Sequence, residues 1–226
     1  MNKDKYCEKC NHTGSIVWIE DGYAYAKPCE CQIKLDFERR IKRSGLANLF
    51  EEYTFDKFTV KASWQKVIKD KALSFIENPF GHWFYIGGNS GSGKTMICTA
   101  MVSKLVEQGH DAYYFQWRED SVKLKMNIND FEYYNNLLNK YKNVKVLYID
   151  DLFKGNSSPS EADLRLLFDL INYRYNNKEL ITIISSEKLI DDIIEIDQAI
   201  GSRIYQRSKE YNIKLAENKA LNQRMI

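Results

Sequence analysis

The chain has 226 residues and a formal net charge of +2 at pH 7, from 33 Lys and Arg against 31 Asp and Glu. This length allows one medium-sized domain with a small accessory segment. Because the positive and negative charges nearly cancel, any surface that binds nucleic acid must be a local cluster of basic residues. No apolar run approaches the length of a membrane-spanning helix, and the first residues lead into no signal-like stretch, so we expect a cytoplasmic protein with no membrane partner.

Cysteines are concentrated at the start of the chain. Four of the five fall within the first 31 residues, as a C-x-x-C pair and, eighteen residues on, a C-x-C pair: Cys7, Cys10, Cys29 and Cys31. Because disulfides are rare in the cytoplasm and so short a segment cannot bury enough apolar area to fold alone, we expect a structural Zn²⁺ site between β-like stretches at 15–19 and 23–26. The alternatives are four independent reduced cysteines, or His12 in place of one ligand.

Residues 32–50 are rich in charged helix formers and are interrupted by Gly45, which predicts a linker helix. Its five basic residues between 34 and 43 are typical of a solvated face, with nucleic-acid contact as the alternative. We therefore divide the chain into a zinc-binding region with its linker helix, 1–45, and a main domain, 46–226.

The strongest pattern in the sequence begins at Trp83. The apolar run 83–86 is typical of a buried strand, and a complete G-x-x-x-x-G-K-[ST] motif follows it. Its glycines leave room for backbone N–H groups to surround a triphosphate, Lys94 supplies a positive charge for the β- and γ-phosphates, and the Thr95 hydroxyl can ligate Mg²⁺. A helix is expected from Thr95 to Gly109, with its N-terminus at the phosphates. We therefore predict an ATP site made by Gly88, Asn89, Ser90, Gly91, Ser92, Gly93, Lys94, Thr95 and Met96.

A later apolar strand, 144–149, ends in two acids, Asp150 and Asp151. An acidic pair at a strand end is weak evidence alone, but after a P-loop it forms the Walker B arrangement. In that arrangement Asp150 would hold Mg²⁺, directly or through water, and Asp151 would orient the attacking water. Lys94 and Asp151 are accordingly the predicted catalytic residues within one subunit.

The remaining segments continue the alternation of strands and helices, with Val67 expected among the buried residues of the first helix. Another buried strand ends in the polar residues Ser185-Ser186-Glu187, where a side chain would face the γ-phosphate; an ordinary strand-to-turn exit is the alternative. Strands are expected at 112–117, 180–186 and 211–216, and helices at 63–76, 118–142, 164–175 and 197–208.

Taken together, these parts resemble the DnaC/IstB-like AAA+ ATPases, the bacterial and phage replicative helicase loaders, over nearly the whole chain. The P-loop and Walker B are shared by many ATPases, whereas the cysteine set, the segment around Thr54 and the compact end without a lid narrow the match. The matching stretches are Cys7-x-x-Cys10-x-His12-Thr13-Gly14, Cys29-x-Cys31, Thr54-Phe55-Asp56-x-Phe58, Gly88 to Thr95, Ile149-Asp150-Asp151-Leu152, Gly201-Ser202-Arg203 and Asn222-x-Arg224.

The resemblance implies an α/β fold, namely a three-layer α/β/α AAA+ P-loop domain with a parallel five-stranded sheet, preceded by a small zinc-binding domain and lacking a lid. It places Arg203 as the arginine finger that reaches a neighbour's ATP, a third catalytic residue, and Arg224 as the sensor 2 arginine that binds nucleotide. The sequence departs from the family at two positions. Glu187 stands where Asn is common after the fourth strand, so the sensor 1 residue that binds nucleotide is expected at Ser186 or at Glu187. Asp151 replaces the Glu of many relatives, which predicts slow hydrolysis.

Three functions are consistent with these features. The first is an ATP-dependent loader that assembles as a homo-oligomer and places a replicative hexameric DNA helicase on single-stranded DNA. The second is an IstB-like transposition helper that activates a transposase on duplex DNA. The third is a nucleotide-binding adaptor that occupies the host helicase without turnover. The zinc-type N-terminal region favours the first, and the intact motifs argue against the third.

Overall fold

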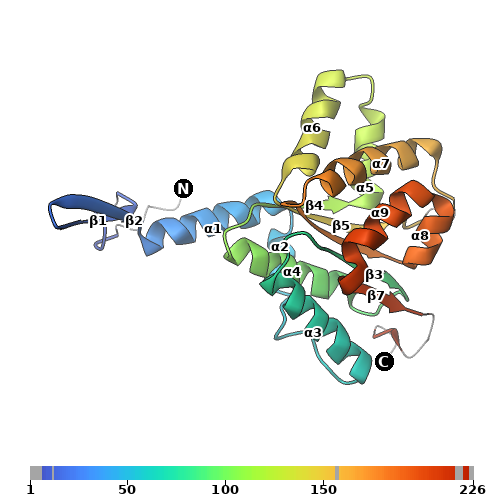
Figure 1. Cartoon of the computed structure of the whole chain (residues 1–226), viewed down its shortest axis with the longest axis horizontal. Helices are drawn as coiled ribbons and strands as arrows, with labels where there is room; N and C mark the ends of the chain where they lie inside the picture. The colour runs from blue at the N-terminus through green and yellow to red at the C-terminus, as the bar shows by residue number, and fades with distance from the viewer. Residues whose placement is uncertain (1–6, 12, 156–157, 217–220, 224–226) are drawn as a thin grey trace.

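The computed structural model describes residues 7–11, 13–155, 158–216 and 221–223, and Figure 1 shows its arrangement. A two-stranded antiparallel hairpin and a long helix form an arm that extends from an α/β domain. The sheet of that domain is parallel throughout, in the order β4-β5-β6-β3-β7. Its strands are β3 (Trp83–Gly88), β4 (Ala112–Gln116), β5 (Val146–Leu152), β6 (Ile181–Ser186) and β7 (Asn212–Leu215).

Helices cover both faces of the sheet, because its central strands are apolar on both sides. All six residues of β3 are buried, and they alternate between two hydrophobic cores: Phe84 and Ile86 join one, Trp83 and Tyr85 the other. The first core is packed by α1 (Glu30–Ser44), α2 (Ala47–Phe50), α3 (Ser63–Glu77) and α4 (Lys94–Glu107). The second is packed by α5 (Trp117–Met126), α6 (Phe131–Asn143), α7 (Glu161–Asn176), α8 (Ile190–Ile196) and α9 (Gln198–Ser208).

The arm consists of β1 (Ser15–Glu20), β2 (Tyr23–Pro28) and α1. The C-terminal end of α1 packs on β4 and α4, and Gly45 ends the helix in the left-handed conformation, with φ of 79°. The expected linker helix and its interruption at Gly45 are therefore present.

The expected fold class is confirmed: the domain has three layers around a five-stranded parallel sheet. No lid is evident among the residues described after β7, and within the described part of the chain no helix is long and apolar enough to cross a membrane.

Several local expectations were wrong. The segment 118–142 is two helices, because a turn follows α5 and the Asp130 carboxylate begins α6 anew by accepting a hydrogen bond from the Tyr133 N–H at 3.0 Å. Trp117 starts α5 rather than ending β4. Val67 is 53% exposed although it lies beside the apolar stripe of α3, and α8 had no counterpart among the expected helices.

Arg174 on α7 is fully buried and has no carboxylate partner among the hydrogen bonds of the described residues. Its guanidinium instead donates to the Thr182 hydroxyl and to four backbone oxygens at 2.7–3.0 Å. Three of these carbonyls, of Tyr141, Lys142 and Val144, belong to the end of α6, where helical carbonyls lack partners within the helix. Arg174 thus joins α6 to the sheet.

Replacing Arg174 by Met should destabilise the domain by about 3 kcal/mol, because several buried carbonyls would lose their donors. Chemical denaturation measures the change. Arg165→Met is the matched control, since Arg165 lies on the same helix, 78% exposed and in an ion pair with the equally exposed Glu161, and its loss should change stability by less than about 0.5 kcal/mol. Equal effects of the two substitutions would contradict the role assigned to Arg174.

Candidate functional site

The loop between β3 and α4 is shaped by close backbone contacts. Gly88 has φ of 110°, and a Cβ atom there would lie 1.9 Å from the Leu215 carbonyl oxygen, so only glycine fits. That same carbonyl accepts a hydrogen bond from the Asn89 N–H at 2.9 Å. The loop is therefore fastened to the last strand of the sheet, and it leads directly into the N-terminus of α4 at Lys94.

The Lys94 side chain is folded into this loop. It is only 6% exposed, and its ammonium donates to the carbonyl oxygens of Gly88 and Asn89 at 2.8 and 2.7 Å. Burial lowers the pKa of Lys94, against the opposing effect of the nearby Asp151 and Glu187 charges. A positive charge is thus held where the loop N–H groups and the helix N-terminus already favour an anion.

Asp150 lies near the end of β5 beside the P-loop and is 4% exposed. Its hydrogen-bond donors among the described residues are all hydroxyl groups. The Thr95 hydroxyl reaches its Oδ1 atom at 3.3 Å, which brings the two expected Mg²⁺ ligands together. Tyr114 donates to Oδ2 at 2.7 Å, and Tyr148 and Ser185 each donate to Oδ1 at 2.5 Å. Burial and the Asp150 charge raise the pKa of both tyrosines, which therefore remain hydrogen-bond donors.

Asp151 sits on an irregularity of β5 and faces the cavity. Its φ is 53°, and the pairing with β6 shifts between Ile149 and Leu152. The Asp151 carboxylate pairs with Lys154 at 2.8 Å, and Lys154 also reaches Glu187 at 3.5 Å. The bulge therefore turns the second acid away from the ladder, and a lysine that the sequence patterns did not single out bridges the two acids.

A cavity of about 330 Å³ joins these elements. The P-loop residues Ser90 to Met96 line it, as do Asp151, Lys154 and Glu187. The opposite wall comes from the segment before α3, where Phe58 lies against Gly93, and from Gln223 near the chain end. Its remaining lining residues are Tyr53, Lys57, Thr59, Lys61 and Gln65.

Ser186 does not line this cavity. It is fully buried, and its hydroxyl donates to the Leu152 carbonyl at 2.7 Å and accepts from the Lys188 N–H at 3.0 Å. Between the two expected sensor positions, the geometry favours Glu187, which does line the cavity. The residue of β6 that contacts both acids is Ser185, because it donates to Asp150 and accepts from the Asp151 N–H at 3.0 Å.

The two arginines of α9 differ in setting. Arg203 is half-buried between the rings of Phe168 and Tyr175, with its guanidinium carbon 5.3 and 5.6 Å from their centroids, and it does not line the cavity. Arg207 is 8% exposed and lies 5.8 Å from the Trp83 ring centroid, in the core. Arg203 is therefore the more accessible of the two. Arg224 and His12 lie outside the described residues.

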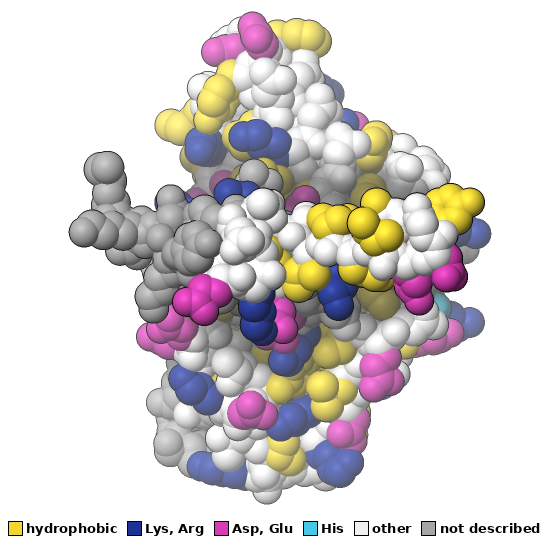
Figure 2. Space-filling view, turned by 90° about the vertical axis from the view of Figure 1, so that its left-hand side faces the viewer, with side chains coloured by type: hydrophobic (Ala, Val, Ile, Leu, Met, Phe, Trp, Pro, Cys, Tyr) yellow, Lys and Arg dark blue, Asp and Glu magenta, His cyan; other side chains and the backbone are white. Residues whose placement is uncertain are grey.

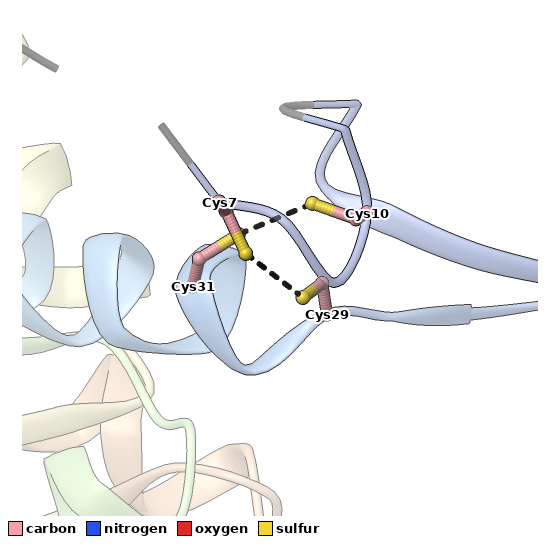
Figure 3. Close-up of side chains that lie close together, drawn as sticks. All are labelled: Cys7, Cys10, Cys29 and Cys31. Atoms are coloured by element: carbon pink, nitrogen blue, oxygen red, sulfur yellow. Dashed lines mark hydrogen bonds between the residues drawn. The ribbon is translucent and has the colours of Figure 1, made fainter. Parts of the chain in front are cut away.

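The four N-terminal cysteines converge at the junction of the hairpin and α1, as Figure 3 shows. Their sulfur atoms all lie within 4.8 Å of one another, with Cys7 and Cys29 at 3.7 Å and Cys10 and Cys31 at 3.6 Å. Tetrahedral Zn²⁺ with Zn–S bonds of about 2.3 Å separates its sulfurs by about 3.8 Å, so the cluster fits a zinc site. Although burial opposes it, hydrogen bonds from Gly14 and the neighbouring thiols lower the pKa of Cys10 to about 6.

Sequence reasoning missed the hydroxyl groups around Asp150 and the wall formed by residues 53–61. Tyr114 and Tyr148 looked like ordinary strand residues. The pairing of β4 with β5 brings Tyr114 to the acid, whereas Tyr148 lies two residues before Asp150 on the same face of β5. The family-like stretch around Thr54 was a usable signal, since it forms part of the cavity wall.

Comparison with known proteins identifies relatives of the chain. The protein YqaM of Bacillus subtilis is 33% identical over 216 residues, which cover 89% of this chain and 67% of YqaM. The phage-like element PBSX protein XkdC of Bacillus subtilis is 29% identical over 217 residues, covering 91% of this chain and 80% of XkdC.

A crystal structure of the DnaC helicase loader superposes with a TM-score of 0.61 at 22% identity, covering 75% of this chain and 98% of that one. This likeness shows a shared fold and agrees with the expected α/β architecture around a parallel sheet. The family model described as IstB-like ATP binding protein matches residues 34–207. The chain therefore belongs to the family of IstB-like ATP-binding proteins.

Proposed function

We propose that this protein is an ATP-dependent loader that places a replicative hexameric DNA helicase on single-stranded DNA. The observation behind the proposal is one cavity lined by the P-loop residues Ser90 to Met96, Asp151 and Glu187, in a fold shared with a helicase loader. The IstB-like family membership supports ATP binding. The helicase partner is inferred from the likeness to the DnaC helicase loader. Single-stranded DNA and the homo-oligomer are inferred from the family resemblance of the sequence motifs.

In this proposal the nucleotide lies along the P-loop. Bound Mg²⁺ would neutralise phosphate charge and align the β- and γ-phosphates. Thr95 and Asp150 would hold the ion, and Lys94 would exchange its loop carbonyl partners for phosphate oxygens. Asp151 would orient the attacking water once its carboxylate is released from Lys154. The need to break this ion pair before Asp151 can act supports slow hydrolysis.

The division into residues 1–45 and 46–226 also remains part of the proposal. Gly45 ends α1, and the cysteine cluster, at the other end of that helix, would hold Zn²⁺ as a purely structural ion. The hairpin beyond it exposes apolar side chains that have no core of their own, including Val17 (64%), Ile19 (76%) and Tyr23 (71%). Figure 2 looks onto this end of the molecule, where yellow side chains lie at the surface. We assign the helicase contact to this hairpin, since exposed apolar patches mark protein interfaces.

One observation favours the adaptor as a second candidate. Asp151 is shorter than Glu and is paired with Lys154, so the acid that should orient water is engaged before any nucleotide arrives. A protein that binds ATP without hydrolysing it would then stay bound to the helicase. Steady ATP hydrolysis by the purified protein in the presence of the helicase distinguishes the loader from this adaptor.

The loader proposal predicts nucleotide-dependent capture of the helicase. The tagged protein should retain a bacterial replicative helicase in pull-downs with ATP, and the Lys94→Ala protein should retain at least tenfold less if ATP drives assembly. A Val17→Asp, Ile19→Asp double variant should lose capture while keeping ATP binding. If the parent retains the same amount of helicase with and without ATP, and both variants retain as much as the parent, the loader proposal is contradicted.

The zinc assignment predicts one equivalent of Zn²⁺ per chain in protein purified without added metal. Cys31→Ser should lower this content by at least half and unfold the hairpin, because metal binding supplies the folding free energy of so small a module. Cys98→Ala is the control, since Cys98 is buried in the main core and should leave the zinc content unchanged. Elemental analysis measures both. Less than half an equivalent in the parent protein would refute the site.

The arginine-finger assignment predicts that Arg203→Ala keeps nucleotide affinity but lowers ATP turnover by ~10³. Arginine suits this role because its planar, permanently charged group contacts two phosphate oxygens. Mixing Arg203→Ala with Lys94→Ala chains should restore part of the turnover, since mixed interfaces pair an intact P-loop with an intact finger. The exposed Arg165→Ala serves as the control. Absence of rescue would contradict action between subunits.

A further inference from the structure

The carboxylate of Asp150 has an uneven set of partners. Its Oδ1 atom accepts hydrogen bonds from three hydroxyl groups, those of Tyr148 and Ser185 at 2.5 Å and that of Thr95 at 3.3 Å. Its Oδ2 atom accepts one, from Tyr114 at 2.7 Å. Because a carboxylate oxygen offers about two lone-pair sites, Oδ1 is saturated, whereas Oδ2 keeps room for another partner.

This arrangement leaves the negative charge of Asp150 unneutralised. No Lys or Arg forms an ion pair with it among the described residues, although it is 4% exposed. A buried carboxylate without a cation is unfavourable, and neutral hydroxyls orient it without cancelling its charge. The site thus retains an oriented anion beside the P-loop threonine, as a cation site requires.

Tyr148 and Ser185 have complementary positions in this arrangement. Tyr148 precedes Asp150 by two residues on β5, so both side chains are on the same face of the sheet. Ser185 approaches from β6 and also accepts the Asp151 N–H at 3.0 Å. The Ser185 hydroxyl therefore contacts the Asp150 side chain and the Asp151 backbone N–H at once. These contacts lie where the pairing of β5 with β6 is irregular.

We propose that Tyr148 and Ser185 are positioning residues for the magnesium site: by holding Oδ1 of Asp150 they fix the orientation of the carboxylate beside Thr95, the other expected ligand, and Oδ2 keeps a lone-pair site for the ion or its water. Tyr114 has a different part, because its hydroxyl occupies Oδ2 itself. Mutation of a residue that hydrogen-bonds to a metal ligand typically lowers metal affinity by about 10–100-fold. The inference rests on the proposed ATP and Mg²⁺ site.

The test separates metal binding from nucleotide binding. A fluorescent ADP is titrated into parent and variant proteins at a series of free Mg²⁺ concentrations and in EDTA. Tyr148→Phe should raise the half-saturating Mg²⁺ concentration by about tenfold while leaving the ADP affinity in EDTA within twofold of the parent. Ser185→Ala, the second variant, should act in the same direction.

Two further variants sharpen the comparison. Tyr114→Phe should leave the half-saturating Mg²⁺ concentration unchanged or lower it, because the competing donor on Oδ2 is removed. Tyr85→Phe is the matched control, since Tyr85 is also a buried strand tyrosine but its hydroxyl donates to the Lys188 carbonyl at 2.8 Å. It should match the parent in both titrations.

The outcomes distinguish the two levels of inference. If Mg²⁺ does not affect ADP binding to the parent protein, the proposed metal site itself is overturned. If Mg²⁺ affects ADP binding to the parent protein, but the Tyr148→Phe and Ser185→Ala proteins have the same half-saturating Mg²⁺ concentration as the parent, the positioning role is overturned. An equal loss of ADP affinity in Mg²⁺ and in EDTA, or the same shift in Tyr85→Phe, would reduce Tyr148 to a packing residue and also overturn the role.

Discussion

The structure depends first on the complete burial of β3. Its side chains supply both hydrophobic cores in alternation, so the strand can occupy only an interior position of the sheet, here between β6 and β7. Burial fixes where the strand ends, and the chain must then turn through a loop whose space is limited by the Leu215 carbonyl. The shape of the P-loop thus depends on this packing as well as on the residues of its own motif. The position of Lys94 at the start of α4 follows from the same constraint.

Much of the fold followed from the sequence because its signals are local. Apolar runs predicted all five strands, and the fixed spacing of the P-loop gave the strand, loop and helix around it. The cysteine spacing predicted a cluster, and four sulfurs do converge. These patterns need only neighbouring residues. The roles of the individual site residues remain predictions.

What escaped prediction depends on contacts between distant segments. The choice of Ser185 over Ser186 as the partner of Asp150 is decided by register, since Ile149 pairs with Ile184 and the following bulge brings Leu152 opposite Ser186. The bridge from Lys154 to Asp151 and Glu187 likewise requires the end of β5 to meet the end of β6. The break between α5 and α6 rests on one capping aspartate, Asp130, in a stretch without Gly or Pro.

The strand order has a consequence for how the protein is made. β3 comes first among the sheet strands in sequence, yet it lies between β6 and β7, the two that are synthesised last. A chain emerging from the ribosome therefore holds the complete P-loop sequence long before the loop can take its shape, because Asn89 is fastened to Leu215. Such non-local pairing is slow to form. The nascent protein must keep this fully buried strand unpaired until β6 and β7 have been synthesised, and the P-loop can take its shape only after Leu215 has emerged.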